Sequence, residues 1–240
     1  MTDYRIEHWT SGQTVPDGTD AETISVSVNN RAATRQTIIT QVRRRGMHFI
    51  ERSDWAAHKA RTERMQADWN YAQLAIHHAG RSFGCGPGAL QLQEIQQKQM
   101  GNSIVPSDDI GYHYALDCFG NIFEGRDIRF KGEHVRRYNT GVIGIVLLEN
   151  LTDDQEGNDI VSKVRGAFGT LGFKNRPRAP DRQVQSLGAL VDILREYFHI
   201  NTLGGHREFP GQLGDGKICP GNVGLDVVKS LRSSTGLGAP

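Results

Sequence analysis

The segment that decides the fold is LAIHHA at residues 74–79, an apolar run that ends in two adjacent histidines. An apolar run of this length is typical of a buried strand. Because successive side chains of a strand point to opposite faces, His77 and His78 face opposite sides of the predicted sheet. Only one of them can therefore join a site that is built on one face.

Two downstream segments carry further side chains that bind metals. GHRE at residues 205–208 contains His206, and KICPG at residues 217–221 contains Cys219. Zinc binds imidazole nitrogen and thiolate sulfur, and a catalytic zinc has three protein ligands and one open position for water. A histidine of the 74–79 strand, His206 and Cys219 therefore form a candidate zinc site, which requires a rigid sheet to bring these segments together.

The chain alternates predicted strands with predicted helices. Strands are expected at residues 74–79, 111–117, 121–126, 141–148 and 202–206, and helices at 89–100, 181–198 and 223–231. The helix at 181–198 is the clearest, because its apolar residues recur at steps of three and four and form one face. The nearly all-apolar strand at 141–148 is typical of a central strand covered on both faces. The expected fold class is α/β, with a central mixed β-sheet flanked by helices.

The rest of the chain sets the expected domain boundaries. The predicted division is into an N-terminal extension (1–46), a single domain (47–232) with a polar insertion (151–180), and a flexible tail (233–240). Two short strands are expected within the polar extension, at residues 24–28 and 37–40, because β-branched residues recur there.

Composition excludes two classes of protein. The 28 basic and 27 acidic residues give a net charge of +1, whereas a nucleic-acid-binding protein carries a strong basic excess. No apolar run approaches the roughly 20 residues that span a bilayer. The segment MTDYR at residues 1–5 lacks the apolar core of a signal peptide. We therefore expect a chain that is made in the cytoplasm, with no nucleic-acid partner and no membrane span.

The cysteines leave one pairing open. The chain has three of them, Cys85, Cys118 and Cys219, and an odd number without a secretory signal does not indicate a disulfide framework. If Cys219 binds metal, Cys85 and Cys118 are either two buried free thiols, which is the favoured expectation, or a disulfide pair.

Six short motifs occur in the order found in a known family. They are RSDWA at 52–56, AIHHA at 75–79, GYHY at 111–114, GNIFEGR at 120–126, GHRE at 205–208 and KICPG at 217–221. Over roughly residues 47–232, the chain resembles the peptidoglycan recognition protein and type-2 N-acetylmuramoyl-L-alanine amidase family. The resemblance implies the fold of that family. It also implies a zinc-dependent hydrolase that cleaves the amide bond between N-acetylmuramic acid and L-alanine in peptidoglycan.

The resemblance assigns roles to five residues. The zinc ligands are expected to be His77, His206 and Cys219. Tyr112 matches the tyrosine that faces the metal and orients the attacking water. Lys217 matches the catalytic lysine, whose ammonium group stabilises the oxyanion that develops when water attacks an amide carbonyl.

Other positions concern the cleft and the general base. His134 matches a histidine that lines the cleft in several relatives, and we expect it and Asn139 to contact substrate. Val146 stands where some cell-wall recycling relatives carry a glutamate base, and valine cannot accept a proton. The chain therefore resembles the phage and recognition-protein branch. The loop at residues 209–216 is longer than in many relatives, and His78 is expected to be either structural or a neighbour of the site.

Two alternative functions stay open. The first is a recognition protein that binds peptidoglycan without cutting it, although such members usually lack one metal ligand, most often the cysteine. The second is a cysteine hydrolase in which Cys219 is the nucleophile and His206 the base, which requires these two groups to lie close together. That interpretation leaves His77 and Tyr112 without a role.

The substrate sets the expected place of action. Peptidoglycan lies outside the cytoplasm, so a chain without a signal peptide either reaches it by non-classical export or by lysis, or acts on recycled cell-wall fragments inside the cytoplasm. Val146 argues against recycling, because the recycling relatives carry a glutamate at that position. The favoured interpretation is an antibacterial toxin effector delivered into the periplasm of a target cell, followed by a phage-type lysin. An effector implies a further partner, an immunity protein that covers the active-site cleft.

Overall fold

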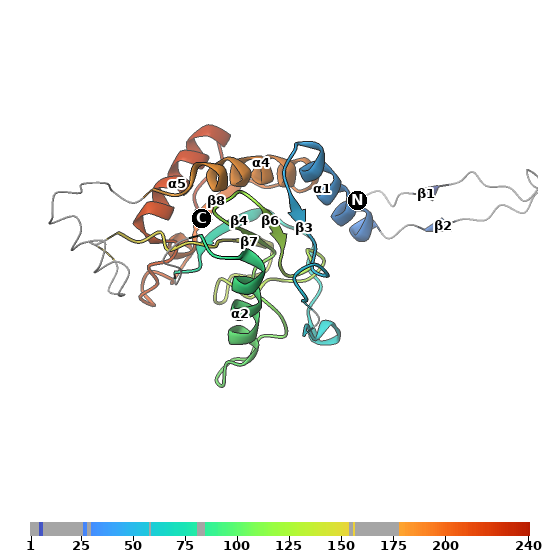
Figure 1. The fold of residues 1–240 in the computed structure, drawn as a ribbon, viewed down its shortest axis with the longest axis horizontal. Coiled ribbons are helices and arrows are strands. Elements are labelled where there is room, and N and C mark those ends of the chain that lie inside the picture. Colours follow the sequence, from blue (N-terminus) through green and yellow to red (C-terminus); the bar gives the residue numbers. More distant parts are fainter. Residues whose placement is uncertain are drawn as a thin grey trace, which may run out of the picture.

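A six-stranded mixed β-sheet forms the centre of the fold (Figure 1) in a computed structural model that describes residues 5–6, 26–27, 30–57, 59–80, 85–153, 156 and 178–240. From one edge to the other, the strands are β3 (Phe49–Ile50), β6 (Ile122–Glu124), β5 (Tyr114–Leu116), β7 (Val142–Leu147), β4 (Gln73–His78) and β8 (Thr202–Gly205). The hairpin of β5 and β6 is antiparallel, and all other neighbouring strands are parallel. A separate two-stranded sheet pairs β1 (Arg5–Ile6) with β2 (Val26–Ser27).

Strand β4 lies between β7 and β8 and pairs in parallel with both. Its apolar residues Leu74, Ala75 and Ile76 are fully buried, as the 74–79 pattern predicted. A strand with parallel neighbours on both sides is covered on both faces, which is why its sequence is apolar rather than alternating. This position makes β4 a rigid support for the histidine at its end.

Helices cover both faces of the sheet and confirm the predicted α/β class (Figure 1). They are α1 (Asn30–Arg44), α2 (Gly88–Met100), α4 (Asp181–Tyr197) and α5 (Gly221–Thr235), with short 3-10 helices η2 (Thr62–Arg64) and η3 (His206–Glu208). Helices α1, α4 and α5 pack in one core cluster with Leu74 and Ile76 of β4. Helix α2 packs on the opposite face, where Leu92 joins Ala115 and Val146. Within the described ranges, no helix is long and apolar enough to cross a bilayer.

The N-terminal boundary requires a correction. The prediction of a strand at 37–40 is wrong, because these residues lie within helix α1. Ile38, Ile39 and Val42 are buried in the main core cluster. Residues 30–44 therefore belong to the domain, and the predicted boundary at residue 47 lies too late. The helix is polar apart from these few positions, so its apolar face was too narrow to predict a helix.

The C-terminal tail also differs from the prediction. Residues 233–235 continue helix α5, and Leu237 is buried in the main core. The N–H of Leu203 donates to the carbonyl of Gly238, and the N–H of Gly238 donates to the carbonyl of Asn201, both at 2.9 Å. The expected flexible tail is therefore docked along the edge strand β8. The predicted insertion at 151–180 lies mostly outside the described residues, which include only 151–153, 156 and 178–180 of it.

Cys85 and Cys118 form a disulfide, so the favoured expectation of two free thiols is wrong. The bond joins the segment before α2 to the turn of the β5–β6 hairpin. The carboxylate of Glu149 lies 3.0 Å from Sγ of Cys118. Sequence spacing alone could not place these two cysteines together, because they are 33 positions apart and meet only once the sheet has formed.

Candidate metal centre and cleft

Two histidines and a cysteine converge at one edge of the sheet. His77 lies on β4, His206 begins η3 directly after β8, and Cys219 lies in the loop before α5. Their ligand atoms all lie within 4.8 Å of one another. Because β4 and β8 are adjacent and parallel, their carboxyl ends meet at the same edge, where parallel sheets commonly bind ligands.

The loop that carries Cys219 is held against the ends of both strands. The N–H of His78 donates to Sγ of Cys219 at 3.4 Å, and the N–H of Arg207 donates to the carbonyl of Cys219 at 2.9 Å. Gly221 has φ +82°, and a Cβ there would lie 2.3 Å from the carbonyl oxygen of Leu151. The glycine of the CPG motif is therefore required by this close approach.

Burial sets the protonation of the cluster. It lowers the pKa of His206 to about 4 and the pKa of His77 well below its ordinary value, so both imidazoles are neutral near pH 7. Burial raises the pKa of the Cys219 thiol to about 12, and the N–H of His78 opposes this rise. The neutral imidazoles can donate lone pairs directly, whereas Cys219 has to lose a proton when it binds a metal.

The other predicted cleft residues lie close behind the cluster. Nδ1 of His134 lies 3.1 Å from Nε2 of His77, and the side-chain oxygen of Asn139 accepts hydrogen bonds from the N–H groups of His134 and Val135. His134 is 7% exposed, yet both residues border a cavity. A contact of His134 or Asn139 with substrate therefore stays a prediction. His78 points to the other face, where its Nδ1 accepts the N–H of Leu151 at 3.1 Å.

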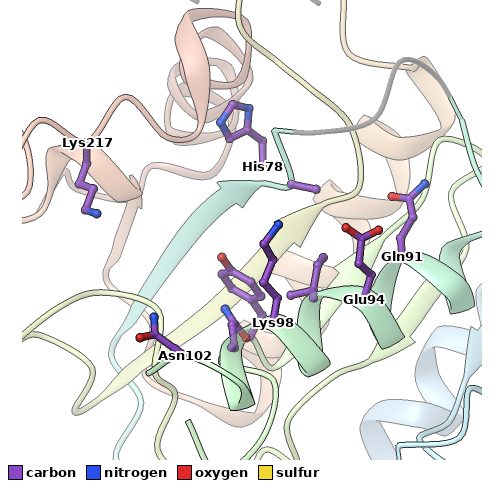
Figure 2. A pocket seen from close by; sticks show the side chains of 10 residues that line it. His78, Gln91, Glu94, Lys98, Asn102 and Lys217 are labelled. Carbon is purple, nitrogen blue, oxygen red and sulfur yellow. The ribbon is translucent and has the colours of Figure 1, made fainter. Parts of the chain in front are cut away.

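An open cleft of two adjoining cavities runs past the cluster. One has a volume of about 610 Å³ and the other about 710 Å³, and both are bordered by Gln99, Asn102 and Lys217. In Figure 2, Glu94 and Lys98 project from α2 along one wall of the smaller cavity, and Lys217 extends from the opposite loop. The cleft therefore passes between α2 and the loop that carries Cys219.

Tyr112 and Lys217 border this cleft, and their catalytic roles stay predictions. The ring centre of Tyr112 lies 4.9 Å from that of His77. Lys217 is exposed, and its charge lowers the pKa of both His206 and Cys219. Val146 lies opposite His77 in the β4–β7 register and is fully buried, so this position offers no proton acceptor.

Two further residues support the site and were missed at the level of sequence. Arg126 is 1% exposed; its guanidinium donates to the carbonyls of Ile110 and Lys131 and pairs with Glu133 at 2.9 Å. It therefore ties together the two segments that carry Tyr112 and His134. The GNIFEGR motif contains Arg126 but does not reveal this role. Gln212, which contacts His206, lies outside every motif.

Comparisons with known proteins identify the family of this chain. A family model described as N-acetylmuramoyl-L-alanine amidase matches residues 6–222. Peptidoglycan-recognition protein SC2 of Drosophila melanogaster is 33% identical over 108 residues, which are 44% of this chain and 56% of the relative. Peptidoglycan-recognition protein LB of the same fly is 30% identical over 107 residues, 42% of this chain and 43% of the relative. The chain thus spans about half the length of these curated relatives.

Solved structures share the fold at low sequence identity. Drosophila PGRP-LB superposes with a TM-score of 0.58 at 20% identity, covering 80% of this chain and 96% of that one. The amidase LysC from Clostridium intestinale superposes with a TM-score of 0.55 at 19% identity, covering 79% and 98%. A complex of PGRP-LCa and PGRP-LCx with bound tracheal cytotoxin gives a TM-score of 0.57 at 22% identity, covering 76% and 95%. Because the family model matches most of its length, the chain belongs to the peptidoglycan recognition protein and type-2 N-acetylmuramoyl-L-alanine amidase family.

Proposed function

We propose that this protein is a zinc-dependent N-acetylmuramoyl-L-alanine amidase that hydrolyses the amide bond between N-acetylmuramic acid and L-alanine in peptidoglycan. The observation that carries the proposal is the convergence of His77, His206 and Cys219 beside an open cleft, which His206 borders. Family membership supports amidase chemistry, and the tracheal cytotoxin complex of a similar fold supports a ligand of this class.

The three side chains fit a catalytic zinc ion. Two imidazole nitrogens and one thiolate sulfur are ligands that zinc prefers, and three protein ligands leave one position open. When bound, zinc acts as a Lewis acid that lowers the pKa of water from about 15.7 towards about 7 and polarises a carbonyl. His77, His206 and Cys219 would hold the ion, and the cleft beside them admits a substrate of several residues.

Tyr112 and Lys217 are proposed to act on the amide carbonyl and on the attacking water. The phenol of Tyr112, beside His77, orients the water or donates a hydrogen bond to the carbonyl oxygen. The ammonium group of Lys217 reaches the cleft from the opposite side and stabilises the negative charge that develops on that oxygen. The peptide amine then leaves with a proton.

The direct test is product identification. Zinc-loaded protein incubated with isolated peptidoglycan should release stem peptides with new free L-alanine amino groups, while the glycan strands keep their length. Mass spectrometry of the soluble fraction and labelling of the new amines measure both products. New reducing ends without new L-alanine amines would contradict the amidase assignment.

A non-catalytic recognition protein is the second candidate. It is favoured by the names of the curated relatives, which are peptidoglycan-recognition proteins. The complete set of one cysteine and two histidines favours the enzyme, because binding without cleavage does not require it. Cosedimentation with peptidoglycan that generates no new amines would support this second candidate.

A cysteine hydrolase is disfavoured by the environment of Cys219. The reactive form of cysteine is the thiolate, and reactive cysteines have a lowered pKa. Burial instead raises the pKa of Cys219 to about 12, so without a metal the thiol stays protonated near pH 7. Nucleophilic attack therefore lacks its thiolate in the metal-free protein, whereas a bound cation would itself favour loss of the proton from Cys219.

We propose further that the protein acts in an oxidising compartment, as an antibacterial effector in the periplasm of a target cell or as a phage-type lysin. The Cys85–Cys118 disulfide supports this placement, because disulfides persist in the periplasm and are rare in the cytosol. An effector of this kind requires an immunity protein, and we propose that it covers the cleft between α2 and Lys217.

Expression in two compartments of a Gram-negative host tests this placement. We expect lysis when the chain carries an added periplasmic signal sequence, and no lysis when it is confined to the cytoplasm, because only the periplasm contains the substrate. Optical density and cell morphology after induction measure the effect. The Cys219→Ala variant with the same signal serves as the control and should be harmless. Equal toxicity of the cytoplasmic form and of this variant would contradict the proposal.

A further inference from the structure

His77 and His206 each have one ring nitrogen in contact with a buried polar side chain outside the candidate metal site. Nε2 of His206 lies 3.1 Å from Oε1 of Gln212, and Nε2 of His77 lies 3.1 Å from Nδ1 of His134. Gln212 is only 2% exposed. The hydrogen bond at one nitrogen of an imidazole decides which nitrogen carries the proton and which is free to bind a metal. These two contacts therefore bear directly on metal binding.

The side-chain amide of Gln212 has one orientation that satisfies its surroundings. Its Nε2 donates to the carbonyl oxygens of Arg136 at 2.9 Å and Pro210 at 3.3 Å. A flipped amide would place its oxygen against two carbonyl oxygens, and none of these three atoms can donate. Oε1 of Gln212 therefore faces His206. Because a carbonyl oxygen only accepts, Nε2 of the neutral His206 ring carries the proton.

The Nε2 proton of His77 is fixed in a similar way, by His134, whose own tautomer is set by a backbone carbonyl. Nε2 of His134 lies 3.3 Å from the carbonyl oxygen of Val142, so this nitrogen donates and Nδ1 of the same neutral ring accepts. Nδ1 of His134 then accepts the Nε2–H of His77. The remaining nitrogen of His77, Nδ1, already lies 3.6 Å from Sγ of Cys219.

We propose that Gln212 and His134 are positioning residues that hold His206 and His77 as Nε2–H tautomers, so that both rings present the lone pair of Nδ1 to the metal. The inference rests on the zinc site of the proposed function. It assigns a role to the loop between His206 and Cys219, since Gln212 is the buried residue of that loop that faces the cluster. Partners of this kind typically change metal affinity by about 10–100-fold when they are removed.

The tautomers can be measured in the zinc-free protein by imidazole ¹H–¹⁵N correlation NMR. We expect a protonated Nε2 and an unprotonated Nδ1 on both His77 and His206. The Gln212→Met variant keeps the side-chain volume but removes the acceptor. In this variant the Nδ1–H tautomer of His206 should become populated, while the tautomer of His77 stays unchanged. The Kd for zinc, measured by chelator competition, should rise by about 10–100-fold. Leu213→Ala, at an exposed neighbouring position of the same loop, should leave both readouts unchanged.

Two results would overturn the inference. One is a protonated Nδ1 on either histidine of the wild-type protein, and the other is a Gln212→Met variant with wild-type tautomers and zinc Kd. If that variant fails to fold, as judged by circular dichroism, the tautomers measured in the wild-type protein alone test the inference. The spectra are recorded without zinc, so they do not depend on activity. If the tautomers are as expected but the protein fails to cleave peptidoglycan, the failure counts against the proposed function and not against this inference.

Discussion

The Cys219→Ala and His206→Ala variants are each expected to lose zinc and amidase activity together. The wild-type chain should bind about one zinc ion through three protein ligands. Removing one ligand leaves two, which are too few to hold the ion against water and buffer. Activity should fall below detection, because in the proposed mechanism the ion is what activates the water and polarises the carbonyl. Elemental analysis of the purified proteins and amine release from peptidoglycan measure the two losses.

A matched control distinguishes ligand loss from general damage. His199 is exposed in the short connection between α4 and β8, so His199→Ala should keep full zinc content and turnover. A strong chelator should inactivate the wild-type protein, and added zinc should restore it. If Cys219→Ser keeps full metal and activity, the ligand assignment is wrong. Activity that survives the chelator would favour the cysteine-hydrolase alternative.

The Lys217→Ala and Tyr112→Phe variants are expected to keep zinc and fold but to lose turnover. Neither side chain belongs to the cluster of metal-ligand atoms, and both border the cleft. Loss of one group that stabilises the developing oxyanion commonly lowers kcat by about 10²–10³-fold. Zinc content and thermal unfolding should match the wild type, while kcat for amine release falls by this factor.

The comparison with an exposed lysine elsewhere makes this result specific. Lys229 is exposed on helix α5, and Lys229→Ala removes the same charge without touching the cleft. Its kcat should equal that of the wild type. Wild-type turnover in Lys217→Ala would show that Lys217 is a surface residue without a catalytic role. Zinc loss in Tyr112→Phe would instead show that the phenol supports the metal rather than the substrate.

The sequence by itself was sufficient for five of the six strands of the central sheet, and it did not predict the edge strand β3. The strands predicted at 74–79 and 141–148 occur close to those bounds as β4 and β7, and the hairpin of 111–126 occurs with strands shorter than predicted, β5 and β6. Each is a short apolar segment bounded by polar or glycine residues, so its signal is local. The candidate ligands could also be predicted, because the chemistry of zinc selects imidazole and thiolate regardless of their distance along the chain.

Only the tertiary structure decided the elements with weak local signals. The large apolar residues of helix α1 are Ile38, Ile39 and Val42, and they become a core face only when α4 packs beside them. The segment after α5 has no pattern of its own and is ordered by backbone pairing with β8. The Cys85–Cys118 pair meets because the sheet brings the hairpin turn to the segment before α2.

The candidate metal ligands could be predicted from the sequence, whereas the hydrogen bonds that other residues make to them could not. His77, His206 and Cys219 can be read from the sequence because their side chains carry the metal chemistry themselves. Gln212 cannot, since a glutamine in a loop has no function until a folded neighbour fixes both ends of its amide. Residue type determined what this chain can bind. Long-range packing determined the hydrogen bonds, and hence which nitrogen of each imidazole faces the cluster, because hydrogen bonds depend on distances that only the folded chain defines.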